Sequence, residues 1–532
     1  MRDTLRGIGL AVAVLAIGLW AAPGLAQELA KEQRIRISIP VADIKSLDPA
    51  FATLTGEKEI VGSMTNGLLR FPTGKLGIEK VEGDLAERWT VSPDGLTWTF
   101  SLRKGVKFHK GFGELSADDV KFTFDRMLNP ATGSPWITKY HNLAAVEVVN
   151  PLTVRIKLKK ADPFFAFNVI GYHGGQIVSK KAVEKFGKDI AFNPIGTGPF
   201  VFEAYTKGQG VTLKRNQDYF RGAPILEQVN YIFMPDDSSR MLAMQKGEVD
   251  LGTGVRRKEW AERATKMGMI LMPPDPPQQS IVIFNMKRKP LDDLRVRQAL
   301  AYALDREVFV DLLGPILGGP QISSIPPGYF GHTEEGLEPY NYNPEKAKKL
   351  LAEAGYPNGF DLGDVAISKA WDYLEPMKII QEYWRKVGVN FNLKVVDHPT
   401  YHKLIREDAN PVVIYGGVRL PIASSLLSEF YSKDAIVGKP TAITNFSHYG
   451  EVIPGIDEYL EKAEATTNLK EKERYFKLAQ EKINKDLPAH ALFLNRVELT
   501  RQKWVDLGYD TKPYETLYYV IEITEKTKIL KH

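Results

Sequence analysis

Few residues in this sequence have a type and spacing that could do chemistry, and the clearest case is a pair of histidines, His398 and His402. On a helix, side chains four residues apart share a face, so two imidazoles at this spacing can grip one metal ion. Pro399, however, predicts that His398 lies outside the helix, and no third histidine is nearby. We interpret both as surface histidines at a helix start and predict no metal site, with nickel binding as the alternative.

Other candidate catalytic groups have simpler explanations. Asp118 and Asp119 suit the first turn of a helix, where the helix dipole favours acids, better than acid–base catalysis. Residues 196–198 (Gly-Thr-Gly) lead into a proline and a strand, so they cannot present a helix N-terminus to a phosphate. Neither the nucleophile-elbow pattern G-x-S-x-G nor the zinc motif H-E-x-x-H occurs. The sequence therefore predicts no catalytic residues, no cofactor and no enzyme, and a secreted hydrolase is a weak alternative.

Length and charge narrow the class of protein. The chain has 532 residues, too many for one ordinary core, so two or three lobes are expected. It carries 70 basic and 65 acidic residues, a net charge of +5, without a pronounced basic run. This distribution gives no electrostatic basis for binding nucleic acid.

The N-terminal residues 1–26 have the pattern of a secretory signal peptide. Arg2 and Arg6 precede an apolar stretch over residues 8–22, and residues 24–26 (Gly-Leu-Ala) suit cleavage after Ala26. An uncleaved anchor is the alternative. The chain contains no cysteine, which excludes disulfides and also the lipid attachment of a lipoprotein.

Residues 289–314 predict a pair of helices near mid-chain. Asp292 or Asp293 can cap the first helix and Asp305 the second, and Gly314 followed by proline ends it. The apolar run at residues 280–286 predicts a strand directly before them. Strands and helices alternate on both sides of this region, which is typical of α/β lobes. Earlier in the chain, Ser116 is expected to cap a helix over residues 117–128 with Asp119.

The same helix pair resembles the signature of the family 5 solute-binding proteins of ABC importers, the peptide, nickel and opine class. Five further blocks resemble that family's motifs and come in its order. The five are residues 47–50 (LDPA), 83–89 (GDLAERW) with 93–95 (PDG), 108–109 (FH) with 116–120 (SADDV), 193–200 (NPIGTGPF) and 246–250 (KGEVD). The helix pair itself contributes residues 290–310 (PLDDLRVRQALAYALDREVFV).

The resemblance implies an α/β fold: a two-lobed periplasmic binding protein of type II, cluster C, with an extra strand-rich subdomain. We expect a discontinuous first lobe, an extra subdomain inserted in it, and a second lobe. The expected ranges are 27–63, 190–284 and 495–532 for the first lobe, 64–189 for the subdomain, and 285–494 for the second lobe.

It also implies a function without chemistry. The protein is expected to bind a peptide-like or small, anionic organic solute between its lobes and to deliver it to ABC permease subunits in the inner membrane. Nickel-binding and opine-binding members of the family are alternatives, and so is a peptide binder that holds the ammonium with other acids. A chemoreceptor-coupled sensor would use the same clamp. We expect a monomer, free in the periplasm.

One departure from the family bears on the ligand. In the peptide-binding branch, a Trp-x-Ala-Asp element supplies an aspartate for the peptide ammonium. Residues 412–426 (VVIYGGVRLPIASSL) contain no acid and instead place Arg419 after two glycines. A guanidinium prefers a carboxylate or phosphate, so we expect an anionic ligand, or one without a free amino terminus. The alternative is that Arg419 faces solvent or forms an internal salt bridge.

Four more ligand contacts are expected from position in the family. Tyr415 and Phe446 should face the cleft from the second lobe, Thr53 should face it from the first, and Asn285 should sit in the crossing strand. The alternative is a place in the core, because an aromatic residue at a strand end is more often part of the core than a ligand contact.

Overall fold

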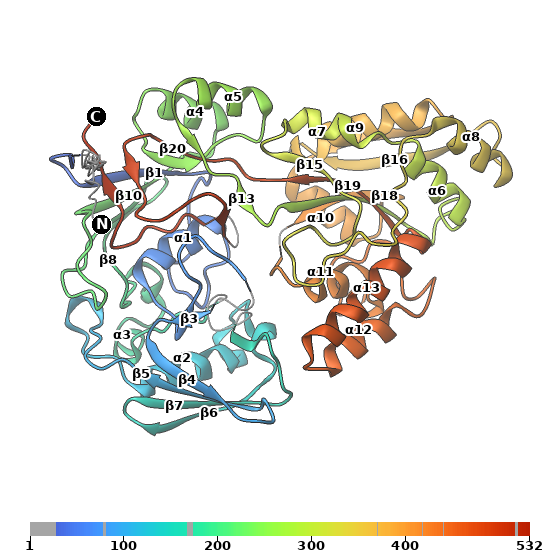
Figure 1. Cartoon of the computed structure of the whole chain (residues 1–532). Helices are drawn as coiled ribbons and strands as arrows, with labels where there is room; N and C mark the ends of the chain where they lie inside the picture. Colours follow the sequence, from blue (N-terminus) through green and yellow to red (C-terminus); the bar gives the residue numbers. More distant parts are fainter. Residues whose placement is uncertain are drawn as a thin grey trace, which may run out of the picture.

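The computed structural model describes residues 28–77, 81–166, 174–369, 371–417, 419–439, 441–516 and 520–532. These residues form two lobes joined by two extended connections (Figure 1). The predicted signal peptide, residues 1–26, lies outside the described residues. Within the part of the chain that is described, no helix has the length and apolar character needed to cross a membrane.

A seven-stranded sheet forms the centre of the first lobe, in the order β12-β20-β11-β1-β10-β9-β8. Ile35, Ile37 and Ile39 of β1 are buried, as expected for a central strand. Helices α4 and α5 lie on the opposite side of the sheet from α1 (Figure 1). The bounds are Arg34–Ile39 (β1), Phe200–Thr206 (β8), Gly210–Arg215 (β9), Gln228–Phe233 (β10), Leu251–Thr253 (β11), Ile270–Leu271 (β12), Leu499–Arg501 (β20), Thr55–Met64 (α1), Asp237–Gln245 (α4) and Lys258–Lys266 (α5).

A strand-rich subdomain is attached to this lobe. Its antiparallel sheet has the order β4-β5-β7-β6 and packs with α2 around a core of aliphatic and aromatic side chains. Helix α2 begins where predicted, because the backbone N–H of Ser116 donates to Asp119 Oδ2 at 3.0 Å in a capping box. The bounds are Ala86–Val91 (β4), Thr97–Leu102 (β5), Leu143–Asn150 (β6), Thr153–Leu158 (β7), Ala117–Leu128 (α2), Lys180–Phe186 (α3), Leu69–Arg70 (β2) and Glu82–Gly83 (β3).

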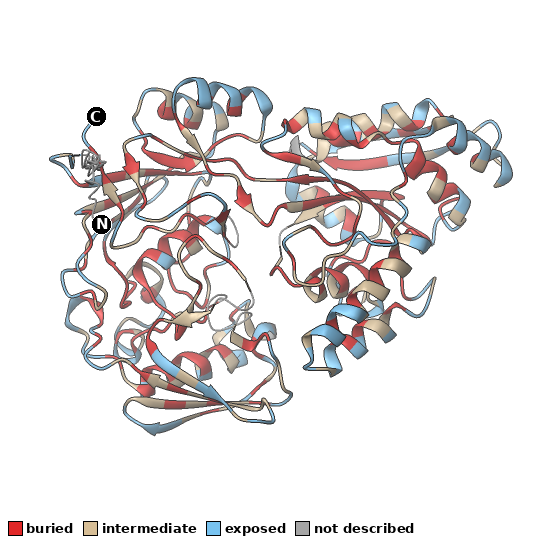
Figure 2. Cartoon of the chain, viewed as in Figure 1, coloured by how far each residue is buried: buried red, intermediate tan, exposed pale blue. Residues whose placement is uncertain are grey.

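The second lobe is built on an antiparallel sheet in the order β15-β19-β14-β18 and on the parallel pair β16-β17. Figure 2 shows buried residues on the sheets and on the inner faces of the helices in each lobe. The bounds are Gly318–Pro320 (β15), Phe360–Ser368 (β16), Val389–Val396 (β17), Val412–Gly417 (β18), Gln278–Phe284 (β14), Ala489–Asn495 (β19), Pro344–Glu353 (α8), Trp371–Arg385 (α9), His398–Arg406 (α10), Ala423–Tyr431 (α11), Ile456–Ala465 (α12) and Leu469–Asp486 (α13).

The helix pair predicted near mid-chain is confirmed as α6 (Leu294–Tyr302) and α7 (Arg306–Leu313). Asp293 caps the first by accepting from the backbone N–H of Arg295, and Asp305 caps the second in the same way. Gly314 ends α7 with a φ of 76°, a left-handed value that favours glycine. Local sequence signals therefore fixed both ends of this pair.

Three strand ends meet where the two connections reach the second lobe. Gln278 opens β14 and lies opposite Asn495, the last residue of β19. Gly417, the last residue of β18, lies opposite Gln279. Hydrogen bonding thus groups the strand 278–284 with the second sheet, whereas the sequence placed residues up to 284 in the first lobe, and the division of the chain into units stays a prediction. Short strands complete the first-lobe side: Pro274–Asp275 (β13), Val505–Asp506 (β21), Tyr514–Glu515 (β22) and Lys528–Ile529 (β23).

Candidate functional site

A pocket of about 640 Å³ lies at the junction of the two lobes. Its walls come from both connections and from both lobes. Arg496 Nη2 lies 2.9 Å from Asp275 Oδ1, so an ion pair ties one connection to the other. The charged and aromatic members of the wall are Asp275 and Arg496 from the connections, Glu515 from the first lobe, and Tyr329 and Phe330 from the second. We call this the junction pocket.

Two glycines end β18 at this junction. A Cβ on Gly416 would lie 2.8 Å from the backbone oxygen of Gln279, so there is no room for a side chain at that position. It would also lie 2.8 Å from Gln278 Nε2, and a Cβ on Gly417 would lie 2.9 Å from Arg419 Nη1. Contacts this short require a neighbour to shift. The space that the sequence assigned to a ligand beside Gly417 is therefore occupied by the side chain of Arg419.

Arg419 is held at both its backbone and its side chain. The Tyr329 hydroxyl accepts from the Arg419 N–H at 3.1 Å and donates to the Arg419 carbonyl at 3.2 Å. Burial raises the pKa of Tyr329 to about 12, so the hydroxyl keeps its proton. The guanidinium forms an ion pair with Glu429 of α11 and lies 5.7 Å from the centroid of the Phe430 ring.

Arg419 therefore forms an internal salt bridge, which was the alternative to ligand binding. A ligand role for Arg419 stays a prediction. The pair is not fully buried: the side chains of Arg419 and Glu429 are 23% and 17% exposed. A guanidinium has five N–H donors, more than one carboxylate can accept. The geometry therefore allows an anion to share or replace the contact with Glu429.

Tyr415 and Phe446, the two aromatic residues predicted to contact a ligand, belong to one cluster of rings in the second lobe. The Tyr415 ring lies 5.5 Å from Phe446 and 5.8 Å from His402, centroid to centroid. Tyr415 is 8% exposed and Phe446 only 1%. Phe446 is therefore part of the core. It can influence a ligand indirectly, by supporting the ring of Tyr415. Both roles stay predictions.

The placement expected for Asn285 needs correction. The crossing ends at Gln278, where β14 begins, and Asn285 follows the far end of that strand, about 20 Å along it at roughly 3.3 Å per residue. Asn285 is 1% exposed, and its Nδ2 donates to Asp408 Oδ1 at 2.8 Å. The ligand role proposed for Asn285 therefore loses the placement on which it depended.

Thr53 lies where expected on the first lobe, exposed in the loop before α1. Its backbone N–H donates to Glu57 Oε2 at 2.9 Å, which fixes the loop. Its predicted contact with a ligand is untested.

The expectation for the histidine pair was wrong in one respect, since α10 begins at His398 and includes it. Asp397 caps the helix and Pro399 occupies its first turn, where proline is tolerated. The two Nε2 atoms lie 3.0 Å apart. His402 Nδ1 lies 3.1 Å from Arg406 Nη1, and His398 Nδ1 lies 2.9 Å from Ser368 Oγ.

These contacts determine which nitrogen of each ring carries the proton. Arginine has no acceptor, so His402 Nδ1 must accept from Arg406, and the proton of His402 sits on Nε2. Burial, His398 and Arg406 lower the pKa of His402 to about 4, which keeps it neutral. His402 then donates to His398 Nε2, leaving the proton of His398 on Nδ1 toward Ser368. A metal ion would have to displace the proton of His402 and oppose Arg406.

Sequence reasoning missed Tyr329 and Glu429. Tyr329 stands in a loop without a motif, so no signal pointed to it. A sequence signal did exist for Glu429, which is an acid on the apolar helix α11, between Leu427 and Phe430. A buried acid needs a cation, and Arg419 lies ten residues earlier.

Comparison with known proteins decides the family. The profile described as bacterial extracellular solute-binding proteins, family 5, middle region, matches residues 80–437. This chain belongs to that family. The glutathione-binding protein GsiB of Salmonella paratyphi A is 32% identical over 393 residues, 73% of each chain.

Solved structures agree with this assignment. MoaA from A. tumefaciens R10, in complex with mannopinic acid, is 33% identical with a TM-score of 0.81, covering 94% of this chain and all of its own (100%). DppA from Helicobacter pylori, in complex with the peptide STSA, is 26% identical with a TM-score of 0.75, covering 94% and 98%.

The family and the fold class predicted from the motifs are thereby confirmed. This family 5 protein is a solute-binding component of an ABC importer, in a family of periplasmic binding proteins rather than enzymes. Its relatives bind small molecules or peptides.

Proposed function

We propose that this solute-binding protein captures a small organic acid with a peptide-like or opine-like skeleton and passes it to the permease of its importer. The observation that carries the proposal is Arg419, whose backbone N–H donates to Tyr329, a residue in the wall of the junction pocket. Relatives named for glutathione and mannopinic acid support it, since both compounds are carboxylic acids.

The solute carboxylate exchanges with Glu429 at the Arg419 guanidinium. Closure of the lobes then removes water from the pocket and strengthens this charge-assisted contact. Tyr415 and Thr53 approach the solute from opposite lobes. The solute is bound and released unchanged, which is supported by membership of a family of binding proteins.

We further propose that the mature protein begins after Ala26, is free in the periplasm and works as a monomer. Small residues before the cleavage point and the lack of cysteine for lipid attachment support this.

Nickel remains a second candidate solute, because His398 and His402 bring two imidazole nitrogens within 3.0 Å. The ordered protons of the pair oppose it, as Arg406 favours the tautomer in which His402 Nε2 is occupied. An organic acid is therefore the better-supported solute.

A thermal-shift screen over glutathione, mannopinic acid, Ala-Ala-Ala and Ni²⁺ tests the proposal, because a ligand that binds only the folded state stabilises it. The acids should raise the melting temperature, and Arg419→Ala should weaken binding roughly 10–100-fold, as for loss of a hydrogen bond to a charged group. Arg385→Ala, an exposed arginine paired with Glu382 on α9, is the matched control and should leave binding unchanged.

Two results would contradict the proposal. The first is that the tripeptide binds while the acids do nothing, which would show that Arg419 does not select the solute. The second is a new product after incubation with glutathione, which would identify a hydrolase instead.

A further inference from the structure

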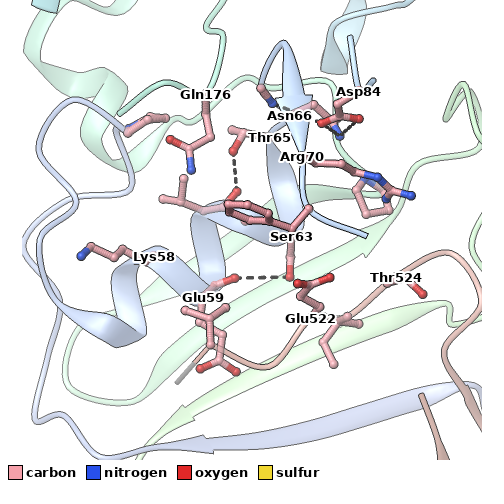
Figure 3. Close-up of a pocket in the computed structure, with 18 of the residues that line it drawn as sticks. Lys58, Glu59, Ser63, Thr65, Asn66, Arg70, Asp84, Gln176, Glu522 and Thr524 are labelled. Carbon is pink, nitrogen blue, oxygen red and sulfur yellow. Dashed lines mark hydrogen bonds between the residues drawn. The ribbon is translucent and has the colours of Figure 1, made fainter. Parts of the chain in front are cut away.

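The first lobe contains a second pocket, of about 160 Å³, between α1 and the C-terminal segment 520–525. It shares no lining residue with the junction pocket. Val61, Leu69 and Phe71 contribute apolar wall, and the volume is comparable to that of a cavity that accepts benzene. We call it the α1 pocket; it is shown in Figure 3.

Glu59 lines this pocket and has a buried carboxylate oxygen without a recorded hydrogen bond. It is 7% exposed, and among the described residues Oε1 has no hydrogen-bond partner. The ammonium of the adjacent Lys58 lies 4.8 Å from the centroid of the Trp136 ring. Burial raises the pKa of Glu59 to about 8, with no opposing contribution from a cation. An unpaired buried acid is costly, so the site has unused capacity to bind.

A second acid faces the same space from the C-terminal segment. Burial raises the pKa of Glu522 to about 7, although the charge of Arg70 and hydrogen bonds to Thr73 and Gly74 act in the opposite direction. Arg70 itself pairs with Glu82, with Nε 2.7 Å from Oε1. Figure 3 shows Glu59, Ser63 and Glu522 at one end of the pocket, opposite Gln176 and Asn66.

We propose that the α1 pocket binds a small alkylammonium ion through Glu59 and Glu522, independently of the solute in the junction pocket. The ammonium supplies the donors and the charge that Glu59 lacks, and its short alkyl chain covers the apolar wall. Two acids disfavour an anion. Within the described part of the chain, no group of three or more His, Cys, Asp or Glu side chains could hold a metal ion.

The space in the pocket can be reduced without changing the acids. Gly62 lines the pocket on α1, is exposed, and a Cβ added there meets nothing within 4 Å. Gly62→Leu therefore places a side chain in open space on the pocket side of the helix. Leucine also has a better helix propensity than glycine, so the variant should fold.

Binding of n-butylamine, measured by isothermal titration calorimetry and thermal shift at pH 7.5, tests the proposal, with n-butanol as a neutral probe of the same shape. The wild type should bind the amine and not the alcohol. Glu59→Gln and Gly62→Leu should each weaken binding at least about tenfold, as expected when a charged partner or the space is lost. Glu345→Gln, an acid 80% exposed on α8, is the matched control.

Arg419→Ala separates this inference from the proposed function, because it should weaken glutathione and leave n-butylamine unaffected. The inference is overturned if n-butylamine does not bind, which would leave the pocket filled by water. It is also overturned if the alcohol binds equally well or if Glu59→Gln retains the affinity.

Discussion

The surface around Arg419 in the second lobe and the α1 pocket of the first lobe differ in whether their charged side chains have partners. In the second lobe, Arg419 is paired with Glu429, and His402 is joined to both Arg406 and His398. In the first lobe, Glu59 is more deeply buried, and its Oε1 has no hydrogen-bond partner among the residues that the structure describes. A ligand can therefore gain binding energy where a buried protein group lacks a hydrogen-bond partner, whatever the type of residue.

The largest difference in the free energy of unfolding is expected between substitutions of two acids of α1, Glu57 and Glu59. Glu57 accepts backbone N–H groups from Lys45, Ser46, Thr53 and Leu54 at 2.7–3.4 Å, whereas Glu59 accepts none that the structure records. Glu57→Ala should lower the free energy of unfolding by roughly 4 kcal/mol, through loss of several charge-assisted hydrogen bonds. Glu59→Gln should cost less than about 1 kcal/mol or stabilise. Urea denaturation at pH 7.5 measures both; equal losses would remove the distinction between paired and unpaired acids.

The pH dependence of stability gives the next largest effect. The pKa of Glu59 is raised from 4.5 to about 8 in the folded protein. Between these values the unfolded state has lost a proton that the folded state retains, so stability falls as pH rises through this window. Relative to Glu59→Gln, the wild type should lose on the order of 3 kcal/mol between pH 4.5 and pH 8.

Urea denaturation of both proteins at pH 4.5, 6 and 8 makes that measurement. Because other groups titrate in both proteins alike, the difference between them isolates Glu59. A difference that does not change with pH would show that Glu59 is already ionised in the folded state.

A smaller effect is expected in the second lobe, where the partner of Arg419 can be removed. Glu429→Gln should release the guanidinium and tighten glutathione binding up to about tenfold, since a partly exposed ion pair is worth about 1 kcal/mol. Isothermal titration calorimetry measures the affinity. Weaker binding, as in Arg419→Ala, would instead show that Glu429 positions the arginine.

The smallest effect concerns the histidine pair. Arg406→Ala removes the donor that holds the proton of His402 on Nε2, so Ni²⁺ affinity should rise about threefold, less than 1 kcal/mol. Arg385→Ala is the control, and calorimetry with Ni²⁺ is the measurement. An unchanged affinity would mean that the tautomer does not limit metal binding.

Sequence reasoning succeeded where neighbouring residues decide the structure. Asp293 and Asp305 cap their helices as predicted, and Ser116 and Asp119 form the predicted capping box, because these contacts need only residues of the first turn. It failed where a distant contact decides. Asn285 was assigned to the crossing, yet its position depends on which end of β14 meets the connections.

The candidate site shows the same limit. The sequence identified Arg419 and the glycines before it, but not the hydroxyl of Tyr329, ninety residues away in the chain. The α1 pocket was not predicted at all, since it forms only where the segment 520–525 packs against α1.

By itself, the sequence determined the family, the α/β class and the local ends of the helices, because these follow from motifs, periodicity and contacts within a few residues. Tertiary structure alone decided which charges are paired. Arg419 pairs with Glu429, whereas Glu59 forms no ion pair within the described part of the chain, because side-chain partners are set by how distant segments pack. Burial then determines the free energy of each charge.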